Sequence, residues 1–171
     1  PEPIKGTIFD GYIRDATLKF YLANVPIVDQ LEPVATVVTD LYGDYVIPDG
    51  LLYDKNYIIK SEGGYDIATV GIDISNDDNP LGQMFLGAPR NISFSAYFSL
   101  NPSDPYPPKN INVLTTIISN KVEKYVEEVI ANNIGATEVS EAVVTNQGTT
   151  AETAVKTNLG LDAEQDITAD Y

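Results

Sequence analysis

The spacing of apolar residues changes near residue 111, and this change limits the folds open to the chain. Before it, short runs rich in Val, Ile, Thr, Tyr and Phe recur about every ten residues, separated by Gly, Pro, Asp and Asn. After it, NVLTTIISNKVEKYVEEVIANN carries its apolar residues at helical spacing, in one stripe. We therefore predict a mainly β fold, with an antiparallel β-sandwich in residues 1–100 and a small α-helical C-terminal region in residues 111–171.

The first ninety residues supply the predicted strands. The run ATLKFYL places Leu18, Phe20 and Leu22 on one face, as expected of a strand with one buried and one solvated side. In TDLYGDY, the Asp40 carboxylate can accept hydrogen bonds from nearby backbone amides, and Gly43 can take a positive φ without strain. These two residues predict a tight turn between two strands, with a ligand-binding role as the alternative.

Residues 91–110 lie between the other predicted strands and the helical part. They hold an alternating strand, NISFSAYFSL, and a connector, NPSDPYPPKN, whose prolines exclude a helix or a central strand. Asn112 is the expected N-cap of the first helix. Two further helices are predicted: one ending at Gly148, and one running from Thr149, which has capping-box spacing to the glutamate three residues on, to a C-cap at Gly160.

The charge and the missing residue types exclude several functions. With 25 acidic and 10 basic residues, the net charge is −15, and this field repels nucleic acid and anionic lipid. The chain has no cysteine and no histidine, so it lacks thiol nucleophiles, zinc thiolate sites and the commonest general base. No apolar run approaches the length of a membrane span. We expect no nucleic acid partner, no membrane insertion, no enzyme activity and no catalytic residue.

Several stretches resemble modules of large secreted and surface proteins of bacteria. They are IKGTIFDGYIRDATLKFYL, VATVVTDLYGDYVI and NYIIKSEGGYDIAT in the first half, then FLGAPRN, INVLTTII and AETAVKTNLGLD in the second. These modules look related to carboxypeptidase-regulatory-like and Cna-B-like β-sandwiches of the transthyretin type. Relative to them, residues 91–110 look like an inserted strand with a Pro-rich connector. The resemblance implies a non-catalytic extracellular module at a cell surface, which assembles with copies of itself or with neighbouring modules in a filament, stalk or adhesin.

Members of such families often carry a calcium loop, D-x-N-x-D-G-x-x-D-x-G-E, between their first two strands. The stretch YLANVPIVDQLE has the same length and keeps Asp29 and Glu32 at the last two acidic positions. Its first three ligand positions hold no acid, and Pro26 stands where the glycine belongs. Because calcium takes about six to eight oxygen ligands, we expect this loop to be degenerate.

A second group of oxygen donors lies in DISNDDN. Asp73, Asn76, Asp77 and Asp78 stand close together and form the better calcium candidate, with a plain polar turn as the alternative. We expect no cofactor, with a bound calcium ion as the alternative. A glycan is also open as a partner, because the tyrosines could line a carbohydrate-binding face. The tripeptide NIS at Asn91 is in addition a glycosylation sequon.

Two apolar segments are predicted to make protein contacts. The candidate interaction residues are Ile4, Ile8, Phe9, Val25, Ile27 and Val28. The last three belong to the degenerate loop, where apolar residues in place of polar ones indicate packing onto the domain or onto a neighbour. The first three lie in the strand-competent stretch 4–9, which we hypothesise completes the sheet of a neighbour.

The sequence thus favours an extracellular structural or interaction module. A carbohydrate-binding or calcium-dependent adhesion domain is one alternative. A virion component, such as a tail fibre or a capsid decoration, is another, because the same fold serves in such particles.

Overall fold

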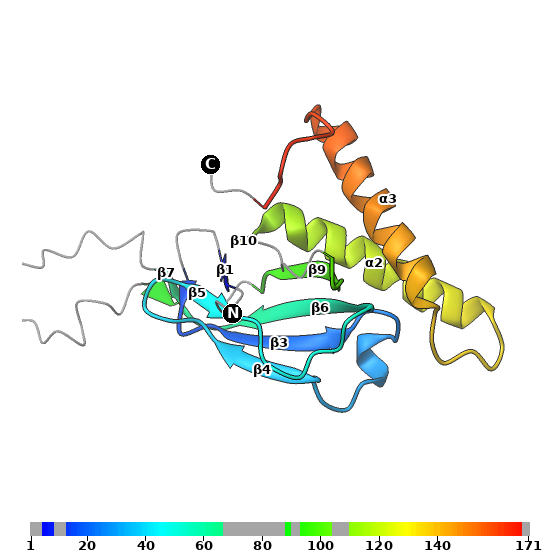
Figure 1. Cartoon of the computed structure of the whole chain (residues 1–171), viewed down its shortest axis with the longest axis horizontal. Helices are drawn as coiled ribbons and strands as arrows, with labels where there is room; N and C mark the ends of the chain where they lie inside the picture. Colours follow the sequence, from blue (N-terminus) through cyan, green and yellow to red (C-terminus); the bar gives the residue numbers. More distant parts are fainter. Residues whose placement is uncertain (1–4, 9–12, 67–87, 90–92, 104–109, 169–171) are drawn as a thin grey trace, which may run out of the picture.

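The computed structural model describes residues 5–8, 13–66, 88–89, 93–103 and 110–168. In these ranges the chain forms ten strands, one short 3-10 helix and two long α-helices (Figure 1). The strands are β1 (Lys5–Ile8), β2 (Ile13–Arg14), β3 (Thr17–Leu22), β4 (Ala35–Val38), β5 (Asp44–Val46), β6 (Lys55–Glu62), β7 (Tyr65–Asp66), β8 (Ala88–Pro89), β9 (Ser95–Leu100) and β10 (Asn110–Ile111). The helices are η1 (Ile27–Asp29), α2 (Val113–Asn132) and α3 (Glu141–Leu159).

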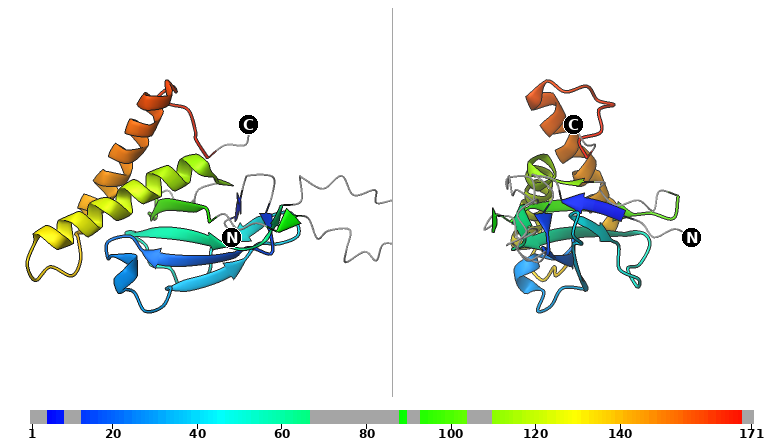
Figure 2. Two further views of the ribbon diagram at one scale, coloured as in Figure 1. Left: turned by 180° about the vertical axis from the view of Figure 1, so that it is seen from behind. Right: turned by 90° about the vertical axis from the view of Figure 1, so that its left-hand side faces the viewer.

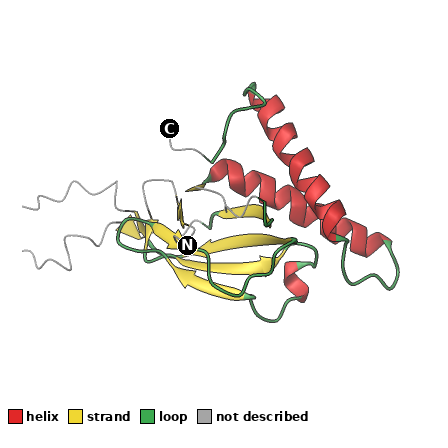
Figure 3. Cartoon of the chain, viewed as in Figure 1, coloured by secondary structure: helices red, strands yellow, loops and turns green. Residues whose placement is uncertain are grey.

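The strands form three sheets. The largest is antiparallel, with the order β4-β3-β6-β9, and it lies below the helices in Figure 3. A second sheet has the order β10-β1-β5, in which β1 pairs parallel with β10 and antiparallel with β5. The third joins the short strands β2, β7 and β8. The predicted antiparallel pairing is therefore confirmed for the strands of the largest sheet.

The two faces of the four-stranded sheet contact different cores. On one face, the alternation in β3 buries Leu18 and Phe20 completely, as predicted, and they pack with Phe98 of β9. Tyr45 of β5 and Ile111 of β10 join the same cluster, so this core lies between the large sheet and the β10-β1-β5 sheet. The other face packs against the helices.

Both long helices lie on the same side of the four-stranded sheet (Figure 2). Ile58 of β6 shares one apolar cluster with Val122 and Val126 of α2 and with Val144 and Val155 of α3. The helices are 20 and 19 residues long, whereas the longest strand has eight residues. The structure is accordingly mixed α/β, and the expectation of a mainly β chain with a small helical region is wrong. The division into residues 1–100 and 111–171 stays a prediction.

The beginning of α2 follows the sequence pattern. Asn112 is the N-cap: its side-chain oxygen accepts a hydrogen bond from the Thr115 amide at 2.9 Å. The Thr115 hydroxyl in turn accepts from the Asn112 amide at 2.8 Å, which completes a capping box. This reciprocal pair satisfies two backbone donors at the helix start.

The two helices predicted on either side of Gly148 are one continuous helix, α3. Gly148 is buried, and a Cβ added there would lie 2.1 Å from Cε1 of Tyr97. It is thus a point of close approach between the helix and β9, not a helix end. The Thr149 hydroxyl donates to the Thr145 carbonyl and caps nothing. Gly160, with a φ of 68°, is the C-cap, as predicted.

Among the described residues, no helix is a candidate for a membrane span. Neither α2 nor α3 is apolar enough over a sufficient length to span a bilayer.

Candidate interaction groove between two strand edges

The turn between β4 and β5 is built by the residues that the sequence singled out. One oxygen of the Asp40 carboxylate accepts hydrogen bonds from the amides of Tyr42 and Asp44, at 2.8 and 3.0 Å. Gly43 takes a φ of 81°, and its amide donates to the Asp40 carbonyl at 3.1 Å. The Asp40 amide donates across to the Asp44 carbonyl at 2.9 Å. The predicted turn is confirmed, and it brings the two strands together at this end.

Beyond the turn, β4 and β5 separate and enter different sheets. β4 pairs with β3 at the end of the four-stranded sheet, and β5 pairs with β1 at the end of the three-stranded sheet. Within the described ranges, neither strand pairs with any other strand on its remaining side. In Figure 1, β4 forms the lower edge of the large sheet and β5 lies above it. The hairpin is therefore open, and the β4 edge has no strand partner on its second side among the described residues.

A shallow groove of about 210 Å³ lies between these edges. Its lining residues are Val37, Val38, Asp40, Asp44, Tyr45 and Val46. Tyr45 is only 2% exposed, and burial raises the pKa of its phenol above the ordinary value, so the ring is neutral at physiological pH. Val38 is 58% exposed at the rim. The groove therefore combines a buried aromatic floor, an apolar rim and carboxylates near the turn.

The β4 edge carries little of the protection that exposed strand edges usually have. Natural proteins shield such edges with charged residues, with proline or with bulges, because open backbone groups invite another strand. Residues 33–39, PVATVVT, contain no charged residue, and their one proline, Pro33, lies before the strand and not within it. Val34, Leu41 and Tyr42 are also exposed near this edge. The arrangement can accept an extended segment through backbone pairing and apolar contact.

The loop 21–32 is held by a residue that sequence reasoning missed. The Gln30 side chain accepts a hydrogen bond from the Leu22 amide at 3.0 Å, and it donates to the carbonyls of Leu22 and Val25 at 2.8 and 3.0 Å. A single amide group thus organises the loop from inside. Glutamine suits this position because it is both donor and acceptor.

The predicted metal and contact residues of this loop lie in different surroundings. Asp29 and Glu32 are exposed, and the described residues contain no group of three or more acidic side chains arranged for a metal ion. Ile27 packs against the helical core and Val25 is half-buried, whereas Val28 is 85% exposed. The second calcium candidate, Asp73, Asn76, Asp77 and Asp78, lies outside the described residues.

The N-terminal contact segment is paired within its own chain. Residues 5–8 form β1, which has β5 on one side and β10 on the other. Ile8 belongs to this strand, while Ile4 and Phe9 lie outside the described residues. In this arrangement the segment completes the sheet of its own molecule.

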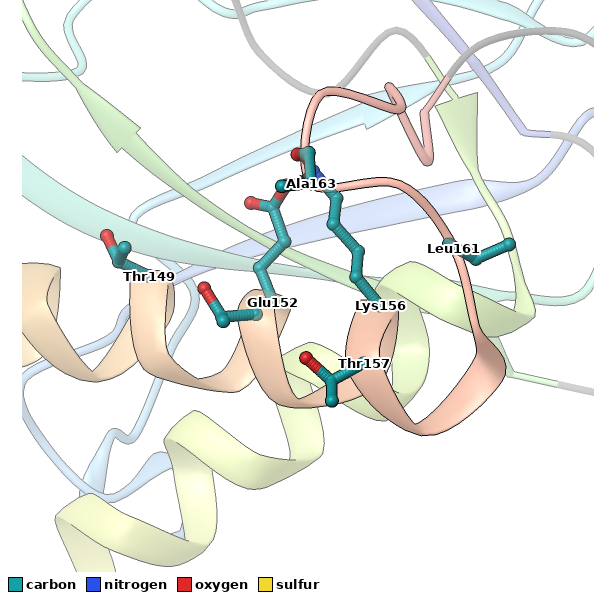
Figure 4. A pocket seen from close by; sticks show the side chains of 7 residues that line it. Thr149, Glu152, Lys156, Thr157, Leu161 and Ala163 are labelled. Atoms are coloured by element: carbon teal, nitrogen blue, oxygen red, sulfur yellow. Dashed lines mark hydrogen bonds and ion pairs between the residues drawn. The ribbon is translucent and has the colours of Figure 1, made fainter.

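A second hollow, of about 260 Å³, lies between α3 and the segment that follows it (Figure 4). The Lys156 ammonium is 2.7 Å from the Glu152 carboxylate and donates to the Ala163 carbonyl at 2.9 Å. These contacts satisfy the two charged groups of the hollow within the chain. Its evident role is to fasten residues 161–163 to the helix.

A buried polar cluster fastens α3 to the sheet. Asn56 of β6 is 1% exposed, and its side-chain nitrogen donates to the Glu141 carboxylate at 2.7 Å. The Tyr97 hydroxyl donates to the Asn56 side-chain oxygen at 2.6 Å. Burial raises the pKa of Tyr97 to about 12, so the hydroxyl remains a donor at physiological pH. The second Glu141 oxygen is 3.1 Å from the Lys55 ammonium, so the buried groups of this cluster have partners within the chain. The cluster explains packing, and the β4–β5 groove is the candidate site.

Comparisons with protein-family models, with curated proteins and with solved structures found no match to this chain.

Proposed function

We propose that the chain is a non-catalytic structural module that joins copies of itself or neighbouring modules by strand pairing at the open β4–β5 hairpin. The observation that carries this proposal is the edge of β4, which pairs with no second strand among the described residues and borders a groove with an apolar rim. Such an edge gives affinity through main-chain hydrogen bonds, and adjoining apolar side chains add specificity.

The distribution of charge supports the same role. A net charge of −15 keeps dissolved chains apart. Against that background, the uncharged run 33–39 is a surface on which another chain can settle without burying a charge. Attachment is thereby directed to one edge instead of being spread over the molecule.

We also propose a transthyretin-type or Cna-B-like fold and an extracellular, cell-surface location, mainly on the basis of the sequence resemblance. A core enclosed between the four-stranded sheet and the β10-β1-β5 sheet is compatible with a transthyretin-type or Cna-B-like sandwich. Modules of that type implied an extracellular, cell-surface setting. The helices α2 and α3 then form an additional layer on the outer face of the large sheet.

The test is Val38→Lys, which places a charge on the exposed rim of the groove. Sedimentation velocity over a range of protein concentrations, with negative-stain microscopy of the same samples, should show association of the wild-type chain and its loss in the variant. Ile134→Lys is the matched control, because Ile134 is a fully exposed apolar residue in the loop between α2 and α3. Equal association of Val38→Lys and the wild type would refute a role for this edge.

A further inference from the structure

We infer that the occupant of the β4 edge is β4 of a second copy, paired antiparallel about a two-fold axis at Thr36. The pairing would join two four-stranded sheets into one continuous sheet. This inference rests on the proposed function, which it deepens by naming the partner, the strand and the register.

The backbone pattern of β4 leaves the necessary groups free. The Thr39 amide donates at 2.9 Å to the carbonyl of Ala16, which directly precedes β3 in the same molecule. Hydrogen bonding in an antiparallel ladder alternates with a period of two residues. Val37 and Ala35 therefore pair toward β3, and the backbone groups of Thr36 and Val38 face the open side. This alternation ends before Val34, whose amide donates to the Phe20 carbonyl of β3 at 2.8 Å.

The side chains of the edge are complementary to themselves. Thr36 and Val38 of β4 are exposed and lie on the same face of the sheet, since strand residues two apart share a face, and Val34 is exposed just before the strand. In an antiparallel pair centred on Thr36, this threonine faces its own copy, and Val38 lies near Val34 at the start of the other molecule's strand. Cross-strand threonine pairs and pairs of β-branched residues stabilise sheets. A two-fold contact needs this kind of self-matching surface.

Charge favours a second copy at this edge over a partner that binds by ion pairs. Residues 33–39 offer no charged group to a partner, so recognition depends on shape, apolar contact and backbone pairing. The same run is present in every copy, and no copy has to desolvate a charge there. A uniformly neutral strand within a strongly acidic chain is best matched by another neutral strand.

The absence of native cysteine allows a direct test of the register. Paired residues at the centre of an antiparallel contact have Cα atoms about 5.5 Å apart, inside the range of about 4.4–6.8 Å that a disulfide spans. Thr36→Cys should therefore form a covalent dimer under mild oxidation, seen on a non-reducing gel. Thr150→Cys, an exposed threonine on α3, is the matched control.

We expect at least about a tenfold faster dimer formation for Thr36→Cys than for Thr150→Cys. An equimolar mixture of the Val34→Cys and Val38→Cys chains, one carrying a mass tag, should give the mixed dimer in preference to either self-dimer. If Val38→Lys abolishes association but Thr36→Cys forms no dimer, the register and the two-fold pairing are wrong while the edge function stands. If the chain stays monomeric and no variant cross-links, both are wrong.

Discussion

At the scale of single residues, the contact between Gly148 and Tyr97 decides how closely α3 approaches the sheet. The ring occupies the space where a Cβ of residue 148 would stand, with Cε1 at 2.1 Å and Cζ at 2.5 Å. The ring is held in turn, because its hydroxyl donates to the buried Asn56. A side chain at position 148 therefore requires either the helix or this hydrogen bond to move.

We expect Gly148→Ala to destabilise the protein, although alanine is the better helix former by about 1 kcal/mol. The overpacking should cost about 1–3 kcal/mol and outweigh that gain, which thermal and urea unfolding can measure. Thr149→Ala, at the next and exposed position, is the control and should change stability little. Tyr97→Leu combined with Gly148→Ala should be less harmful than the sum of the single changes. Additive losses would show that the two residues do not interact.

At the scale of elements, one side chain joins the start of α2 to the C-terminal segment. The Asn112 oxygen caps the helix, while its amide nitrogen donates to the Ile167 carbonyl at 3.0 Å. Ile167 is buried in the helical core. Asn110 donates in the same way to the Thr168 carbonyl at 2.6 Å. The segment after α3 is thus fastened to the beginning of α2.

Asn112→Asp and Asn112→Ala should separate these two roles. Aspartate keeps the capping oxygen and loses the donor to Ile167, whereas alanine loses both. Amide hydrogen exchange should become faster near Ile167 in both variants. The free energy of unfolding should fall by about 1 kcal/mol more in Asn112→Ala, through loss of the cap. Slow exchange at Ile167 in Asn112→Asp would mean that burial of the isoleucine alone holds the segment.

Local patterns in the sequence predicted the elements that depend on neighbouring residues. Alternation identified β3, the N-cap identified the start of α2, and the pair Asp40 and Gly43 identified the turn. The continuity of α3 was not predictable in this way. A glycine in this position of the sequence indicates a helix end. In the structure, residue 148 is a glycine inside the helix because the ring of Tyr97, about fifty residues earlier in the chain, leaves no room for a Cβ.

The candidate site was predictable in kind but not in place. The sequence predicted strand pairing by the N-terminal segment 4–9, and apolar packing onto the domain or a neighbour by the loop 21–32. The N-terminal strand is paired on both sides in its own chain, and the loop is organised by Gln30. β4 and β5 enter different sheets because β4 pairs with β3 and β5 pairs with β1. No local sequence pattern predicts these pairings.

At the scale of the whole molecule, the net charge opposes the proposed pairing at the β4 edge. Two chains of charge −15 repel each other at low ionic strength. The Debye length is about 10 Å at 0.1 M salt and about 3 Å at 1 M. The uncharged contact itself contains no ion pair for salt to weaken. We therefore expect association to strengthen several-fold between about 0.05 and 0.5 M sodium chloride, measured by sedimentation equilibrium.

The register also predicts which acid matters most. Glu32 precedes β4 and Asp40 follows it, so an antiparallel pair brings the Glu32 end of one strand to the Asp40 end of the other, and carboxylates gather just beyond the paired strands. Glu32→Gln should therefore strengthen association and reduce its dependence on salt. Glu164→Gln, an exposed position after α3, changes the net charge equally and should have a smaller effect. Equal effects would mean that only the total charge acts, and weaker association at high salt would mean that ion pairs hold the contact.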